Sequence, residues 1–175
     1  MELDKDLAAR QEARLLCQQA DTAAKKLRHF SQAQLDAITK AMADAFSQSA
    51  PQLAELAVQE TGFGNTRDKT YKNRFASQTV WESIRDMQCV GVLSEDSRNK
   101  LWKIGVPVGV IAAIIPSTNP TSTVCYKALI AIKSGNSIVF SPHPKALEST
   151  MKAVSVLTDA AKTAGALRKL LQNCM

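Results

Sequence analysis

Apolar positions along the first 88 residues recur every three or four positions, which is the period of an amphipathic helix. The pattern predicts a first helix from residue 3 to about residue 30. A second helix is expected to follow Ser31, because Ser31 and Gln34 have the spacing of a capping box. The apolar stripe of this second helix predicts four core positions: Leu35, Ile38, Met42 and Phe46.

Two further helices are expected before residue 88. Pro51 is suited to the first turn of a third helix, and Gly62 is suited to end it in a left-handed conformation. A fourth helix is predicted from about Thr66 to Met87. Its expected core face carries Val80, Ile84 and Met87. Residues 1–88 are therefore predicted to be mainly helical.

The character of the chain changes at Cys89. Residues 89–107 form two strand-like apolar segments separated by the polar stretch SEDSRNK, which predicts two strands joined by a turn. Pro107 lacks a backbone N–H, so the chain there is expected to be an edge or a strand boundary. Such a ribbon is a possible site of association between chains.

Residues 108–175 have the pattern of β-α-β sheet units. An apolar β-branched run stops at Pro116, Asn119-Pro120 is suited to begin a helix, and Ser134-Gly135-Asn136 to end it. A second buried strand follows around Val139. The fold class is therefore predicted to be α/β, with an N-terminal helical layer and a β-arm leading into an incomplete Rossmann-like parallel sheet. The turn after the first strand lies where such sheets bind ligands.

The chain is expected to continue with a helix from about Pro144 to Ala164 and then with a strand-like apolar tail. One face of that helix is predicted to carry Leu147, Met151, Val154 and Leu157.

Composition and charge narrow the function classes. Hydrophobic residues make up 45% of the chain, which suits one globular domain. The net charge is +6, but the cations are scattered and only 5% of residues are aromatic, so nucleic-acid binding is not expected. The longest apolar run is too short to span a bilayer, and no membrane association is expected. The histidines and cysteines lack metal-ligand spacing, so no metal site is predicted.

The four cysteines are far apart in the sequence, and reduced thiols in the cytoplasm are expected. None is in a context suited to an activated nucleophile, and packing is the interpretation favoured for each. They are Cys17, Cys89, Cys125 and Cys174.

The segment IIPSTNPTSTVCYKALIAIKSGNSIVFSPHPKA resembles the corresponding part of CoA-acylating aldehyde dehydrogenases. These include acetylating acetaldehyde dehydrogenases and the aldehyde half of bifunctional aldehyde-alcohol dehydrogenases. The likeness extends upstream through ETGFGNTRDKTYKNRF to about SQAQLDAI. It implies an NAD-dependent oxidation of a short-chain aldehyde, with CoA as the co-substrate that accepts the acyl group. It also implies a homo-oligomer joined through the β-arm, in the cytoplasm or within a bacterial microcompartment.

The resemblance assigns candidate oxyanion donors to the turn after the first strand. An ungapped match places Thr118 at the position of the superfamily's oxyanion-binding Asn, with Asn119 beside it. An amide or hydroxyl there would stabilise negative charge on the aldehyde oxygen. Plain helix capping by Asn119 is an equally favoured interpretation.

The same resemblance implies that the ends of the two strands form part of a nucleotide groove. Ser141 stands where most NAD-dependent relatives have a ribose-binding Lys. The helix that follows is expected to offer free N–H groups to ribose or phosphate. The candidate cofactor-binding residues are Ile115, Pro116, Ser117, Ser141, Pro142, His143 and Pro144.

The enzymes that this chain resembles are more than twice its length, and their nucleophilic cysteine lies in a second domain. Residues 1–175 are therefore expected to be the N-terminal part of a cofactor-binding domain, without the catalytic domain and inactive alone. The alternative is a non-catalytic interaction module that joins a full-length homologue through its β-arm.

Overall fold

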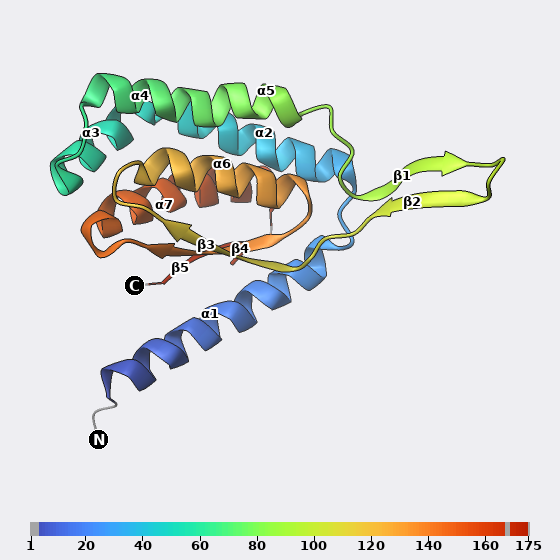
Figure 1. The fold of residues 1–175 in the computed structure, drawn as a ribbon, viewed down its shortest axis with the longest axis horizontal. Coiled ribbons are helices and arrows are strands. Elements are labelled where there is room, and N and C mark those ends of the chain that lie inside the picture. Colours follow the sequence, from blue (N-terminus) through green and yellow to red (C-terminus); the bar gives the residue numbers. More distant parts are fainter. Residues whose placement is uncertain (1–3, 167–168, 175) are drawn as a thin grey trace.

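A computed structural model describes residues 4–166 and 169–174 of the chain (Figure 1). The helical part comprises α1 (Lys5–Leu27), α2 (Gln32–Gln48), α3 (Ala50–Thr61), α4 (Thr66–Arg74), a π-helical segment η1 (Phe75–Thr79) and α5 (Val80–Ile84). The remainder comprises β1 (Gly91–Asp96), β2 (Leu101–Gly105), β3 (Val110–Ile115), α6 (Pro120–Lys133), β4 (Ser137–Pro142), a 3-10 turn η2 (Pro144–Ala146), α7 (Leu147–Thr163) and β5 (Leu171–Asn173).

Three parallel strands in the order β3-β4-β5 form the sheet, which confirms the α/β class and the expected β-α-β unit. Figure 1 shows α6 and α7 on one face of this sheet and α1 across the other. Helix α2 packs outside α6 and α7. The tail predicted to be strand-like pairs with β4 as β5.

The predicted stripe of α2 lies in the core. Leu35, Ile38, Met42 and Phe46 are each no more than 1% exposed. Burial of each such side chain is worth roughly 1.5–3 kcal/mol. These positions therefore tie the helical layer to α6 and α7.

Local signals placed the helix ends correctly. The backbone N–H of Gln34 donates to Ser31 Oγ at 3.3 Å. The backbone N–H of Ser31 donates to Gln34 Oε1 at 2.9 Å, which completes the capping box. Gly62 ends α3 with a φ of 71°, a left-handed conformation that glycine adopts without steric cost.

One helical prediction needs correction. The helix expected over residues 66–87 is broken by the π-helical turn of η1 and ends at Ile84, and Met87 lies exposed beyond it. Val80 and Ile84 of the predicted face pack half-buried against the core, whereas Met87 follows the end of α5 and so leaves that face. Of the four residues predicted to share one face of α7, Val154 and Leu157 are buried, Leu147 is half-buried and Met151 is exposed.

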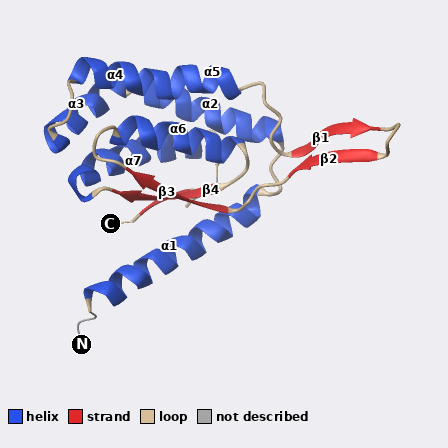
Figure 2. Cartoon of the chain, viewed as in Figure 1, coloured by secondary structure: helices blue, strands red, loops and turns tan. Residues whose placement is uncertain are grey.

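Residues 89–107 form the predicted arm, an antiparallel hairpin that projects away from the sheet (Figure 2). The register pairs Gly91 with Gly105 and Asp96 with Leu101, with an irregularity between Val92 and Ser94. Pro107 lies in the link between β2 and β3, as expected for a strand boundary. Apolar side chains exposed on the arm and the link are Val92, Leu93, Leu101, Trp102, Ile104, Val106 and Val108.

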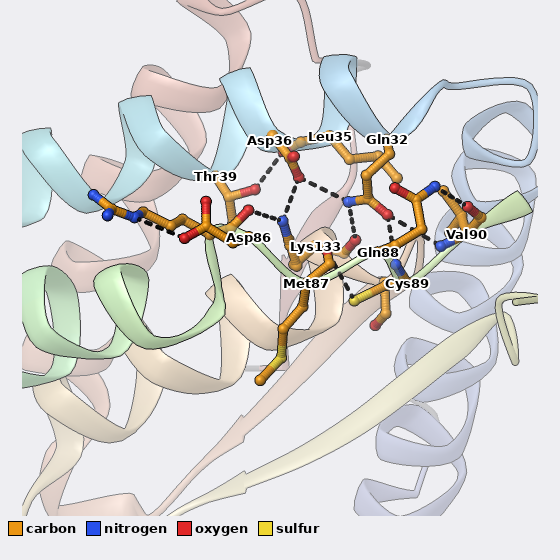
Figure 3. A network of polar contacts seen from close by, with 12 residues as sticks. Gln32, Leu35, Asp36, Thr39, Asp86, Met87, Gln88, Cys89, Val90 and Lys133 are labelled. Atoms are coloured by element: carbon orange, nitrogen blue, oxygen red, sulfur yellow. Dashed lines mark hydrogen bonds and ion pairs between the residues drawn. The ribbon is translucent and has the colours of Figure 1, made fainter. Parts of the chain in front are cut away.

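A polar network fastens the start of the arm to the helical layer (Figure 3). Gln32 Oε1 accepts from the amides of Cys89 and Val90 at 2.7 and 3.0 Å. Gln32 Nε2 donates to Asp36 Oδ1 at 2.7 Å, and the buried Lys133 ammonium donates to the same oxygen at 2.7 Å. Lys133 therefore neutralises Asp36, while Gln32 links the pair to the arm.

Two kinds of site are absent from residues 4–166 and 169–174. No helix in these ranges is long and apolar enough to cross a membrane. No group of three or more His, Cys, Asp or Glu side chains in these ranges is placed to hold a metal ion.

Candidate functional site

The carboxyl ends of β3 and β4 lie side by side. The parallel register pairs Ile115 with Pro142, and the His143 amide donates to the Ile115 carbonyl at 2.9 Å. The loops of residues 116–119 and 141–144 therefore share one edge of the sheet, which confirms the predicted juxtaposition.

The candidate residues differ in exposure. Ile115 is 1% exposed, so its side chain belongs to the core and only its backbone reaches the sheet edge. Pro116 and Thr118 are exposed, and Ser117 and Asn119 are half-buried. In the second loop, Ser141, His143 and Pro144 are exposed and Pro142 is half-buried.

Helix α4 holds the loop that follows β3. Lys69 Nζ donates to the Thr118 carbonyl at 2.6 Å, and Lys72 Nζ donates to Asn119 Oδ1 at 3.1 Å. Thr121 Oγ1 donates to Asn73 Oδ1 at 2.8 Å. Sequence reasoning missed this helix as part of the site. The 3- and 4-residue spacing of these polar side chains, within NTRDKTYKNR, is the signal that places them on one face.

The side chain of Asn119 does not cap α6. Asn119 occupies the N-cap position with φ −140° and ψ 60°, and its side chain accepts from Lys72 rather than from the helix. Its main-chain carbonyl accepts from the Thr123 amide at 3.2 Å and from Thr123 Oγ1 at 2.6 Å. The prediction that α6 begins at Asn119-Pro120 is confirmed, but the proposed capping bond is wrong. An ammonium is the stronger donor for the amide oxygen.

The ammonium of Lys69 is in an unusual environment. Lys69 is 5% exposed, and burial followed by repulsion from Lys72 lowers the pKa of its amine from 10.5. This lysine hydrogen-bonds to the main chain of the loop that carries both candidate oxyanion donors.

The loop after β4 is closed by its own histidine. The Lys145 amide donates to His143 Nδ1 at 3.1 Å, and the Ala146 amide donates to the His143 carbonyl at 2.9 Å. Because Nδ1 accepts, the proton of a neutral ring is on Nε2. His143 therefore presents Nε2 as a donor, while the Ser141 hydroxyl is exposed on the same loop.

The expected free N–H groups at the start of the next helix are not free. Glu60 on α3 accepts from the amides of Glu148 and Ser149, at 2.7 and 2.8 Å. A carboxylate already occupies the position that a phosphate would take at this helix N-terminus. The exposed polar side chains that this loop still presents include Ser141 and His143.

A groove of about 840 Å³ lies between α3 and α7. Its apolar lining includes Leu53, Leu56 and Met151, and Pro144 connects it to the loop after β4. Glu60 also lines the groove and accepts from the Glu148 amide at the start of α7. The groove therefore lies next to the loop that follows β4, on the side of the helical layer.

The cysteines do not complete a nucleophilic site among the described residues. Cys125 is fully buried, with its thiol against the Ala76 carbonyl at 3.5 Å, and burial raises its pKa well above 9.0. The prediction of packing is confirmed for Cys125. It is wrong for Cys17, which is exposed on α1, while Cys89 and Cys174 are half-buried.

A parallel β-α-β sheet with helices packed on both faces defines a protein of the α/β class, in which ligands bind outside the carboxyl ends of the strands. The chain belongs to the aldehyde dehydrogenase family, whose model, "Aldehyde dehydrogenase family", matches residues 4–173. This finding confirms the resemblance noted in the sequence.

Proteins similar to this chain include bifunctional and acetylating members of the family. The bifunctional aldehyde-alcohol dehydrogenase AdhE of Escherichia coli is 41% identical over 160 residues, which are 91% of this chain and 18% of that protein. The crystal structure of an acetylating aldehyde dehydrogenase from Geobacillus thermoglucosidasius is 47% identical, with a TM-score of 0.95 over 99% of this chain and 38% of that one. A probable aldehyde dehydrogenase from Listeria monocytogenes EGD-e is 49% identical, with a TM-score of 0.96 over 98% of this chain and 38% of that one. The chain thus spans less than two fifths of each of these relatives.

Proposed function

We propose that this chain is the N-terminal portion of an NAD-dependent, CoA-acylating aldehyde dehydrogenase and supplies part of its nucleotide groove. The observation that carries the proposal is the parallel pairing of β3 with β4, because it brings the loops 116–119 and 141–144 to one edge of the sheet. The similarity to an acetylating enzyme supports the CoA-acylating branch.

The parent reaction is oxidation of a short-chain aldehyde bound to a cysteine, followed by transfer of the acyl group to CoA. NAD supplies the hydride acceptor of this reaction when it is bound. Asn119 and Thr118 offer N–H and O–H donors for the oxygen of the reacting aldehyde. Ser141 Oγ and His143 Nε2 are the groups on the second loop that fit ribose hydroxyls or phosphate oxygens. The nucleophile is supplied outside this chain.

A second candidate function is a non-catalytic interaction module. The observation that favours it is the β-arm, on which Trp102 and Ile104 are 58% exposed on one face of the ribbon. We propose that the arm pairs with another subunit, in a homo-oligomer or with a full-length homologue, in the cytoplasm or in a microcompartment.

A hybrid enzyme tests the catalytic proposal. This chain replaces the matching segment of the Geobacillus thermoglucosidasius enzyme, and CoA-dependent NADH formation from acetaldehyde is measured. The hybrid is expected to turn over, and the isolated chain is expected to be inactive. A hybrid that is folded by circular dichroism but inactive would contradict the proposal. Turnover by the isolated chain would contradict the assignment of the nucleophile to another part of the enzyme.

Binding between the isolated chain and the full-length homologue tests the second candidate function. Under the interaction-module hypothesis the isolated chain binds the full-length homologue, and Trp102→Lys abolishes that binding. An isolated chain that does not bind the homologue would contradict the second candidate function.

A further inference from the structure

Two lysines on α4 contact adjacent positions of the loop that follows β3. Lys69 and Lys72 are three residues apart, so both project from one face of the helix. Lys69 Nζ lies 2.6 Å from the Thr118 carbonyl oxygen, and Lys72 Nζ lies 3.1 Å from Asn119 Oδ1. Each ammonium therefore contacts the oxygen of a different amide group.

The first contact sets the direction of a peptide group. The bond between Thr118 and Asn119 is trans, so its C=O and N–H point in opposite directions. Lys69 holds the C=O toward the buried side of the loop, which turns the Asn119 N–H away from α4. No described residue accepts a hydrogen bond from that N–H.

The second contact does the same for a side chain. An ammonium has donors only, so the atom of Asn119 that faces Lys72 is the amide oxygen. The Nδ2 group is left facing away from Lys72, and no described residue accepts from it. Asn119 thus has two N–H donors whose paired oxygens are each held by a lysine.

We propose that Lys69 and Lys72 are positioning residues that preset the backbone N–H and the Nδ2 group of Asn119 as the oxyanion donors of the reaction. This inference rests on the proposed function, and it selects Asn119 over Thr118 as the donor residue. Preorganised donors stabilise a developing oxyanion without reorganisation during the reaction. Each ammonium also polarises the amide that it contacts, which makes the N–H a stronger donor.

A purely structural role for these lysines predicts different behaviour. If they only tie the loop to α4, they are equivalent to the bond between Thr121 and Asn73, which joins the same helix to the same region at 2.8 Å. Thr121→Val removes that bond without touching an amide of Asn119. It is therefore the matched control, expected to lower stability while kcat is retained.

The first experiment uses this chain itself. In ¹H–¹⁵N spectra, Lys72→Met is expected to shift the side-chain NH2 resonances of Asn119, while Lys72→Arg, which keeps the charge, largely restores them. Lys25→Met, on α1, is expected to leave them in place. Unchanged Asn119 resonances in Lys72→Met would overturn the proposal.

The second experiment uses the hybrid enzyme. Lys72→Met is expected to lower kcat by about 10- to 100-fold, as for a misplaced catalytic group, with the KM for aldehyde and for CoA nearly unchanged. Lys72→Arg is expected to recover part of the loss. Asn119→Asp keeps an oxygen facing Lys72 but removes Nδ2, and is expected to lower kcat by roughly 10²–10³-fold.

The outcomes separate the two proposals. A hybrid that is active with the unaltered segment and keeps its kcat in both Lys72→Met and Asn119→Asp would overturn the positioning role alone. An equal loss of kcat in folded Thr121→Val would overturn it as well, because a structural tie would then suffice. A folded but inactive unaltered hybrid would overturn the proposed function, and with it the role that depends on it.

Discussion

The backbone amide of His143 donates to the carbonyl of Ile115 at 2.9 Å, directly beyond the last residue pair of β3 and β4. This bond continues the parallel ladder past the end of β4. It therefore fixes the distance between the two loops that carry the candidate site.

Glu60 is expected to stabilise α7 from outside that helix. Its carboxylate accepts from two amides of the first turn, at 2.7 and 2.8 Å. Glu60→Ala should lower the free energy of unfolding by about 1–2 kcal/mol, as for loss of an N-cap with a favourable helix-dipole interaction. Urea denaturation measures this value. Glu55→Ala, on the exposed face of the same helix, is the control and should change it by less than about 0.5 kcal/mol.

The ion pair between Lys133 and Asp36 is expected to contribute strongly to the free energy of unfolding. The Lys133 side chain is only 2% exposed and that of Asp36 is 30% exposed. Lys133→Met leaves Asp36 without its cation and should cost about 2–4 kcal/mol. Lys40 forms a comparable pair with Asp44, but both of these side chains are more than half exposed. Lys40→Met should therefore cost only about 0–1 kcal/mol. Equal losses in the two variants would contradict the assignment.

Gln32 is expected to control the local stability of the arm. Its Oε1 accepts from the amides of Cys89 and Val90, 57 and 58 residues away. Gln32→Ala should increase hydrogen exchange at these two amides while exchange in α7 is unchanged. Peptide-level mass spectrometry can resolve the two regions. Protection retained at Cys89 and Val90 would show that another contact anchors the arm.

The lowered pKa of Lys69 predicts a pH dependence of stability. In the unfolded chain this amine has its ordinary pKa of 10.5, so between the lowered value and 10.5 the unfolded state binds more protons. Below that window the cost of burying the charged amine is fully present, and it is relieved as the pH rises through the window. The unfolding free energy of the native chain minus that of Lys69→Met should therefore increase toward pH 10.5. A difference that is flat or falls would contradict this sign.

Thiol reactivity should follow burial. Because burial raises the pKa of Cys125 well above 9.0, this thiol should remain unmodified by iodoacetamide in the native chain. Cys17 is exposed and should react first. Burial, with nearby Glu12 and Cys17, also raises the pKa of Cys174, which should react more slowly than Cys17. Mass spectrometry of labelled peptides gives the order, and rapid labelling of Cys125 would contradict it.

The features that the sequence predicted depend on residues close together in the chain, whereas those that it missed join residues far apart. The capping box of Ser31, the end of α3 at Gly62 and the parallel β-α-β unit depend on neighbouring residues or on a regular period. The sequence therefore predicted them. The contact of Lys69 with Thr118 joins residues 49 apart, and that of Glu60 with Ser149 joins residues 89 apart. No local pattern encodes such polar pairs.

Those long-range contacts also explain the errors at the site. Capping by Asn119 and free amides before α7 were reasonable from local preference alone. In the folded chain Lys72 takes the Asn119 amide oxygen, and Glu60 takes the α7 amides. Side chains from α3 and α4 thus decide which groups of the two loops remain available.

The most direct test of the central claim is a titration of the ¹⁵N-labelled chain with NAD and, separately, with CoA. If the two strand-end loops form part of a nucleotide groove, shift changes should concentrate in residues 116–119 and 141–144, and Ser141→Ala with His143→Ala should weaken them. Shift changes confined to the groove between α3 and α7, or none at millimolar ligand, would contradict the claim.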